Sequence, residues 1–302
     1  MLALWIPATI AAAFFQNLRS ALQKAIKGRL STMGAAYSRF LYAFPLAVLY
    51  LIAVQQARGS DLPAVNTEFL IYCALGGLSQ ILFTVVLLWM FSFRSFAVGT
   101  TFSKLEVILV AGMGSLLLGD HVGPAALFAI LIGALGTVVL SFNETRLTPM
   151  GLLRGLGERA TAIGILCAAL LGASSVFYRG AILALQGDDF LLAASFALAV
   201  ALGMQTLMMG GWFLIFDRAE LARVVIHWRR AGPVGIAGLA GSICWFTAFS
   251  VQNAAYVRAL GQIELVFTFL ASVFVFRETV SRMEYFGTGL IISSILLIVL
   301  AG

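Results

Sequence analysis

Two apolar stretches of this sequence each carry a glutamate near their start, and this repetition constrains the fold more than any other feature. The first stretch covers residues 102–122, FSKLEVILVAGMGSLLLGDHV, and contains Glu106. The second covers residues 260–280, LGQIELVFTFLASVFVFRETV, and contains Glu264, 158 residues after Glu106. A charged side chain inside an apolar segment is costly, and it is more costly in lipid than in a soluble core. The spacing therefore predicts a duplicated half-chain in which each copy keeps one buried carboxylate.

The composition indicates a membrane protein. Of the 302 residues, 61% are hydrophobic and 11% are charged, whereas charged residues make up about 25% of an ordinary soluble domain. Because such a chain cannot cover its surface with polar groups, we predict a multi-span membrane protein. Its apolar runs are around 20 residues long and do not alternate with polar residues, which favours helices over barrel strands. The predicted fold class is an all-α integral membrane protein.

Several functional classes are disfavoured by the remaining composition. The three cysteines, Cys73, Cys167 and Cys244, lie inside apolar runs without a CxxC pattern, so we expect small buried hydrophobes and no metal site or disulfide. The net charge of +6 is spread over the loops and forms no basic run of the length that a nucleic-acid partner requires. No Walker motif is present, and we expect no cofactor.

Hydropathy predicts about ten membrane-spanning helices. The polar segment 143–159 is expected to connect a first five-helix repeat, residues 1–142, to a second five-helix repeat, residues 160–302. The expected spans are 2–23, 32–54, 68–91, 96–118, 123–142, 160–185, 190–216, 231–252, 255–276 and 283–301.

Lysine and arginine are distributed unequally between the two sides of these spans. Thirteen of the 19 fall in loops on one side, two (Arg58 and Arg258) fall on the other side, and four lie within spans. By the positive-inside rule, the basic loops are cytoplasmic and both termini face outward. Because five is an odd number, a tandem copy of five spans must insert upside down relative to the first copy. We therefore predict two inverted repeats, the usual architecture of alternating-access carriers.

Short motifs recur in both halves. The sequence contains Leu4-Trp5, Leu105-Glu106-Val107, a Gly-Asp-x-Val break at 119–122, Ile263-Glu264-Leu265, Arg277-Glu278-x-Val280, and the glycines Gly133, Gly136, Gly287 and Gly289. Over essentially the whole chain this pattern resembles the EamA-type carriers of the drug/metabolite transporter superfamily. Where that family commonly has a proline after each glutamate, this chain has Val107 and Leu265. The resemblance implies ten helices in two inverted halves around a central cavity, in the inner (plasma) membrane of a bacterium. It also implies transport, most often export, of amino acids, nucleotide-related metabolites, vitamins or drugs.

The charged residues inside the spans are the first candidates for a substrate or coupling site. Glu106 and Glu264 either bind a substrate amine or take up a proton, or they are structural groups bonded to a neighbouring backbone or arginine. Arg39 is a candidate partner for Glu106 or for an acid group of the substrate. Lys104 either faces the cavity or reaches the headgroups. Arginines nearer the helix ends, such as Arg179, are expected to snorkel to the interface.

A second group of candidates is neutral. Their amide and aromatic groups either line the cavity or serve hydrogen bonding and packing between helices. The neutral candidates are Gln16, Asn17, Gln80, Gln262, Tyr178, Trp245 and Tyr256.

These observations predict a secondary transporter. The expected cargo is a small polar or amphipathic metabolite, exported by alternating access with possible proton coupling. Charges within the spans sum to +4 and −2, which favours an amino-acid-like or carboxylate cargo. The alternative is a membrane-embedded lipid-modifying enzyme, which is disfavoured because His121 and His227 both fall in loops and no catalytic motif lies within a span. The expected partners are a small-molecule substrate and the lipid bilayer, and the chain is expected to be a monomer or a weak homodimer.

Overall fold

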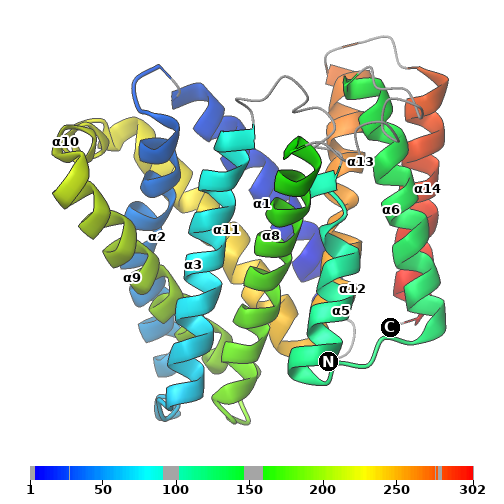
Figure 1. The fold of residues 1–302 in the computed structure, drawn as a ribbon. Helices are drawn as coiled ribbons and strands as arrows, with labels where there is room; N and C mark the ends of the chain where they lie inside the picture. Colours follow the sequence, from blue (N-terminus) through cyan, green and yellow to red (C-terminus); the bar gives the residue numbers. More distant parts are fainter. Residues whose placement is uncertain are drawn as a thin grey trace. The chain divides into compact units, whose positions relative to one another are not determined.

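The computed structural model describes residues 4–26, 28–90, 102–145, 159–275, 277 and 281–301. These residues form helices and no strand, which confirms the predicted all-α class for the described part of the chain (Figure 1). The helices are α1 (Trp5–Ile26), α2 (Thr32–Arg58), α3 (Thr67–Met90), α5 (Glu106–Leu118), α6 (Pro124–Thr145), α8 (Arg159–Ala184), α9 (Phe190–Phe216), α10 (Arg218–Ile226), α11 (Trp228–Val251), α12 (Ala254–Gly261), α13 (Ile263–Leu270), the π-helix η1 (Ala271–Val275) and α14 (Arg282–Ala301).

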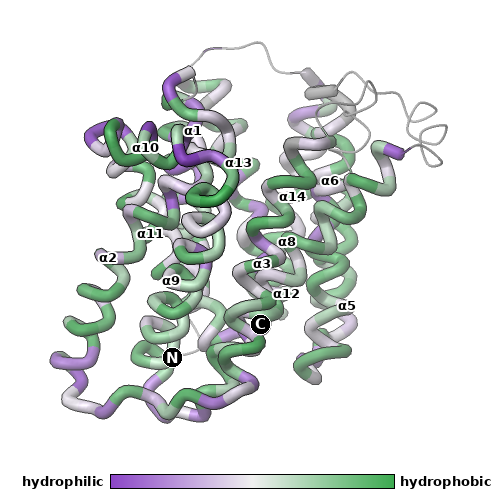
Figure 2. The backbone as a smooth tube through the Cα atoms, turned by 60° about the vertical axis from the view of Figure 1, so that its left-hand side comes forward, coloured by the Kyte–Doolittle hydropathy of each residue, from purple (hydrophilic) through white to green (hydrophobic). Residues whose placement is uncertain are grey.

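Eight helical segments within the described ranges are long and apolar enough to cross a membrane. They correspond to the second, third and fifth to tenth predicted spans. Hydrophobic residues cover most of their surfaces, and hydrophilic residues gather at helix ends and in the connections (Figure 2). Large apolar side chains such as Leu207 and Leu300 are exposed, as expected for a surface that faces lipid. The segments α1 and α5 do not belong to this set, and the count of ten spans stays a prediction.

The chain divides into two compact units, and each unit combines segments from both halves of the sequence. Unit 1 contains residues 1–81 and 177–252, and unit 2 contains residues 82–176 and 253–302. In unit 1, α1 packs on α11, while α2 packs on both α9 and α11. Leu51, Val54, Leu192 and Ala199 form the buried contact of α2 with α9.

Unit 2 is built on two helix pairs. One pair is α6 with α14, and the other is α5 with α12. A Cβ atom added to Gly136 of α6 would lie 2.8 Å from the carbonyl oxygen of Gly287 in α14. The two backbones therefore approach each other directly, which only small residues permit.

Both glutamate-bearing segments are interrupted just before the glutamate. Leu105 N donates to Phe102 O at 3.1 Å, and Gln262 N donates to Ala259 O at 3.2 Å, which are the short-range bonds of a tight turn. α5 begins at Glu106 and α13 begins at Ile263, so each glutamate occupies the first turn of a new helix. The predicted span over 255–276 is thus a membrane-length segment, Ala254–Phe274, that contains α12, α13 and most of η1. The interruption occurs although no proline follows either glutamate.

The segment 217–230, which the predicted spans leave as a loop between the seventh and the eighth, is largely helical. Most of it forms α10, whose N-cap Asp217 accepts a hydrogen bond from Glu220 N at 3.0 Å. Glu220 is fully buried and accepts a bond from Ser31 N at 2.6 Å, so it satisfies a free N–H at the start of α2. The connector 143–159 starts later than predicted, because α6 continues to Thr145, and its residues 146–158 lie outside the described residues.

A candidate coupling site

Glu106 forms a buried ion pair in unit 2. The residue is 8% exposed, and its Oε1 pairs with Nη2 of Arg258. Arg258 belongs to α12 and its side chain is 10% exposed, so its assignment to an outward-facing loop was wrong. The packing of α12 on α5 explains the pair, because it brings two residues together that are 152 positions apart. Arg39, the candidate partner suggested by the sequence, contacts Gln80 in unit 1 instead.

Glu264 completes a group of three charges around Arg258. It lies in the first turn of α13, is partly exposed, and interacts electrostatically with both Glu106 and Arg258. A helix N-terminus favours a negative side chain, and both carboxylates occupy such a position. We call Glu106, Arg258 and Glu264 the ion triad.

The ion triad holds two carboxylates and one guanidinium, so its fully ionised form carries one net negative charge. Glu106 Oε2 has no hydrogen-bond partner within the described residues. An uncompensated charge in a low-dielectric interior is unfavourable. One proton or one small cation would neutralise the triad.

Three predicted residues surround the helix interruptions in unit 2. Gln262 sits at the break between α12 and α13, and its Oε1 lies 2.5 Å from where a Cβ on Gly133 would stand, so the glycine leaves room for the amide. Tyr256 is buried in α12, and its hydroxyl would lie 3.9 Å from a Cβ atom added to Gly123. Lys104 occupies the break before α5 and is partly exposed.

The other charged and amide candidates meet in unit 1. Arg39 Nη2 donates to Gln80 Oε1 at 3.4 Å, and Gln205 Nε2 donates to the same oxygen at 2.9 Å. Gln205, from α9, is 2% exposed. Tyr178 of α8 is 4% exposed and interacts electrostatically with Arg39. Four helices thus contribute to one polar cluster in unit 1: Arg39, Gln80, Tyr178 and Gln205.

The remaining candidates lie on the contact between α1 and α11. Trp245 Nε1 donates to Gln16 Oε1 at 3.2 Å, and the indole stacks on Phe249 with ring centroids 5.8 Å apart. Asn17 is partly exposed on α1. Tyr178 likewise packs against Phe246, at 4.9 Å between centroids. These aromatic groups therefore take part in helix packing.

Arg179, which was expected to snorkel to the interface, binds backbone carbonyls within unit 1. Its Nη1 donates to Phe249 O and Gln252 O, both at 2.7 Å. These carbonyls belong to the C-terminal end of α11, where backbone acceptors lack partners in the helix. The arginine therefore caps a helix, and this contact satisfies its charge within unit 1.

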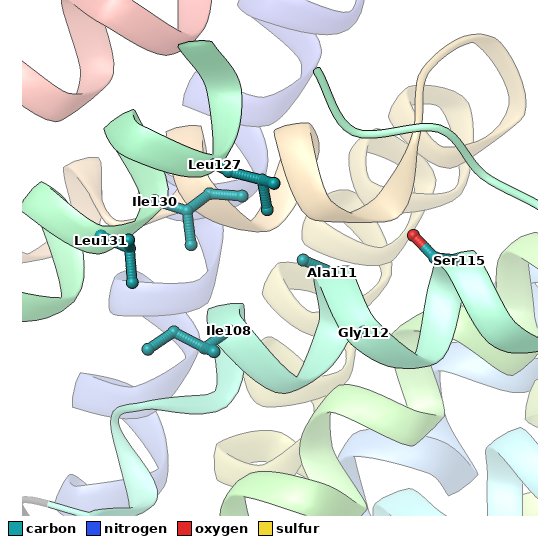
Figure 3. A pocket seen from close by; sticks show the side chains of 7 residues that line it. All are labelled: Ile108, Ala111, Gly112, Ser115, Leu127, Ile130 and Leu131. Carbon is teal, nitrogen blue, oxygen red and sulfur yellow. The ribbon is translucent and has the colours of Figure 1, made fainter. Parts of the chain in front are cut away.

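Unit 2 also has an apolar groove between α5 and α6, with a volume of about 350 Å³. Figure 3 shows its lining side chains, with Ile108 and Ala111 on α5 facing Leu127, Ile130 and Leu131 on α6. The one lining hydroxyl, on Ser115, donates to Asp120 O at 2.8 Å. The groove suits hydrocarbon, and none of the predicted site residues lines it.

The comparisons with known proteins agree with the helical membrane fold. The second half of the chain, residues 159–300, matches the EamA-like transporter family. This family forms part of the drug/metabolite transporter superfamily, and its members are transporters, not enzymes.

A solved structure extends the likeness to the whole chain. It is a crystal structure that is 17% identical to this chain in sequence, with a TM-score of 0.68. The similarity covers 100% of this chain and 98% of the other, and at this identity it shows the fold alone. Among curated proteins, none is significantly similar in sequence.

Sequence reasoning missed two residues of these clusters. Arg258 lies six positions before Glu264, and hydropathy placed it at the edge of a span. A charged residue so close to the second glutamate-bearing stretch could have identified Arg258 as a candidate site residue. Gln205 is an amide in the middle of a long apolar helix, the same signal that selected Gln80.

Proposed function

We propose that this EamA-family membrane protein is a secondary transporter that exports small polar or amphipathic metabolites, with an amino-acid-like or carboxylate cargo. Transport proceeds by alternating access and is coupled to protons at the ion triad. The observation that carries the proposal is the triad itself: two carboxylates share one arginine at two interrupted helices.

The positions of the helix interruptions and of the helix contacts are those expected for an inverted repeat, and they support the proposal of alternating access. The interruptions fall at residues 104–105 and at Gln262, positions that the 158-residue spacing of the glutamates makes equivalent. Three helix contacts also join corresponding spans of the two predicted halves: α2 with α9, α5 with α12, and α6 with α14. Contacts of this kind are expected around a two-fold axis that relates two copies of one fold. Interrupted helices are a common feature of carrier binding sites.

Proton coupling follows from the charge of the triad. With one proton bound, the two carboxyl groups and Arg258 are neutral overall, and the group is stable in a low-dielectric environment. After the proton leaves, the excess negative charge favours a state in which water or a cation reaches the carboxylates. This difference in charge gives the two states different proton affinities, which is what coupling requires.

Reconstituted protein tests the proposal. Purified protein is placed in liposomes containing a pH indicator, and amino acids and short carboxylic acids are added one at a time. We expect at least one compound to produce a saturable proton flux with the wild type. Glu106→Gln and Glu264→Gln are expected to abolish that flux or uncouple it from the cargo, and both proteins stay folded. Asp61→Asn, a change of the same chemistry at an exposed loop position, leaves the flux unchanged.

Two results contradict the proposal. Full, proton-linked transport by both glutamine variants at every pH removes the triad from the mechanism. Chemical turnover of a compound by the protein in detergent, without vesicles, indicates an enzyme. The membrane placement is tested separately, and we propose the bacterial inner membrane, cytoplasmic basic loops and outward-facing termini.

A further inference from the structure

Unit 1 contains a buried arginine, Arg39, whose neighbours include a second arginine: side-chain atoms of Arg39 and Arg19 both lie within 4 Å of where a Cβ on Gly238 would stand. The only hydrogen bond that Arg39 donates to a described residue is the 3.4 Å bond to Gln80, and its Cζ lies 5.2 Å from the Phe40 ring centroid. Its buried Nε has no hydrogen-bond partner in the part of the chain that the structure describes. Over the same residues, no carboxylate forms an ion pair with it. Arginines inside a membrane normally pair with carboxylates or backbone carbonyls, as Arg179 does.

A second donor without a partner lies near Arg39. The hydroxyl of Tyr178 is buried, has no hydrogen-bond partner among the described residues, and belongs to a side chain that is 4% exposed. Tyr178 interacts electrostatically with Arg39, so the two groups are neighbours. The nearby acceptor, Gln80 Oε1, already receives bonds from Arg39 and Gln205. The polar cluster of unit 1 therefore has more donors than acceptors, and it carries a positive charge.

The packing holds these donors in place. A Cβ atom on Gly76 would lie 2.8 Å from the Tyr178 ring, so the ring rests directly on the backbone of α3. On α11, a Cβ on Gly238 would lie 3.1 Å from Arg39 Cγ, and this glycine leaves space for the arginine stem. A site whose donors are fixed before binding loses less conformational entropy when a ligand arrives.

We propose that Arg39, Tyr178 and Gln80 form a binding site for a carboxylate group, and that this group belongs to the transported metabolite. A carboxylate brings one negative charge to one guanidinium, and its two oxygens accept bonds from Arg39 and from the Tyr178 hydroxyl. A cationic cargo leaves the arginine uncompensated. The assignment of the carboxylate to cargo rests on the proposed transport function, whereas carboxylate binding is a separate property of unit 1.

The test is a binding experiment on the purified full-length protein in detergent. The ligands are amino acids and short carboxylic acids, each compared with its own primary amide. A ligand that binds the folded protein raises its thermal midpoint. We expect at least one acid to raise it, while the amide of that acid does not.

Two variants measure the contribution of each donor. Arg39→Gln is expected to weaken acid binding about 10- to 100-fold, and Tyr178→Phe about tenfold, the usual effect of losing a hydrogen bond to a charged group. Arg58→Gln is the matched control, because it removes an arginine from the same helix whose partner is the surface residue Asp189 at 3.1 Å. It leaves acid binding unchanged.

The ligand-free stability of Arg39→Gln separates a binding role from a structural role. A buried cation that awaits a ligand destabilises the empty protein, so its neutral replacement should keep the thermal midpoint or raise it. A lower midpoint indicates a structural arginine and overturns the proposal. Three binding results also overturn the proposal: Arg39→Gln binds the acid as tightly as the wild type, the amide binds as tightly as its acid, or no acid binds at all. Acid binding without vesicle transport, by contrast, leaves this site intact and refutes only the transport function.

Discussion

Removal of the arginine of the ion triad should destabilise the protein strongly. The wild-type triad combines Glu106, Glu264 and Arg258 with a net charge of −1 when ionised, and Glu106 is 8% exposed. Arg258→Gln raises this to two uncompensated negative charges. Breaking a buried ion pair by removing one partner typically costs about 3–5 kcal/mol, because the remaining charge stays buried without compensation. We expect a loss of this size in the free energy of unfolding.

The loss of stability in Arg258→Gln should depend on pH and on whether Glu106 is also replaced. A carboxyl group that binds a proton needs no counter-charge, so Arg258→Gln should be less destabilising in mildly acidic than in alkaline buffer. The double variant Glu106→Gln/Arg258→Gln restores the net charge of −1 and should recover most of the loss. Glu106→Gln alone gives a neutral triad, so it should cost less than Arg258→Gln.

Denaturant titration of the purified protein in micelles measures these differences, and a double-mutant cycle isolates the coupling between the two residues. Arg58→Gln is the control, since its ion pair with Asp189 is partly exposed, far more than the pair of Glu106 with Arg258, and should contribute no more than about 1 kcal/mol. The reasoning is refuted if Arg258→Gln is as stable as Arg58→Gln, or if the double variant is no more stable than Arg258→Gln alone.

Two further predictions concern packing and topology. Gly136→Ala places a methyl group 2.8 Å from the Gly287 carbonyl oxygen, and it should lower the free energy of unfolding, measured by heat or denaturant, by about 1–3 kcal/mol. The matched variant Gly289→Ala has open space at its Cβ position and should be neutral or slightly stabilising. Equal effects of the two variants would contradict the close contact between α6 and α14. In a cysteine-free background, a membrane-impermeant maleimide added to intact cells should label Arg58→Cys and leave Arg229→Cys unlabelled, whereas the reverse pattern would invert the proposed topology.

The sequence alone determined the helical class and the position of most helices. Membrane-spanning segments are recognised by a local property, the length and continuity of an apolar run, so the span predicted over 190–216 coincides with α9. The same local reasoning selected Glu106 and Glu264, because a charge within such a run is visible without any knowledge of its neighbours. The motifs that resemble EamA carriers, together with the family match over 159–300, then indicated transport.

Only the tertiary structure decided what these residues contact. The partner of Glu106 is Arg258 because α5 packs on α12, and the hydrogen-bond partner of Arg39 is Gln80 of α3. Hydropathy averages over a window, so it could not reveal the one-residue interruption at Gln262 or the reach of the Arg179 side chain to the end of α11. The Arg179 contacts join residues 70 and 73 positions apart, and helix packing brings such residues together.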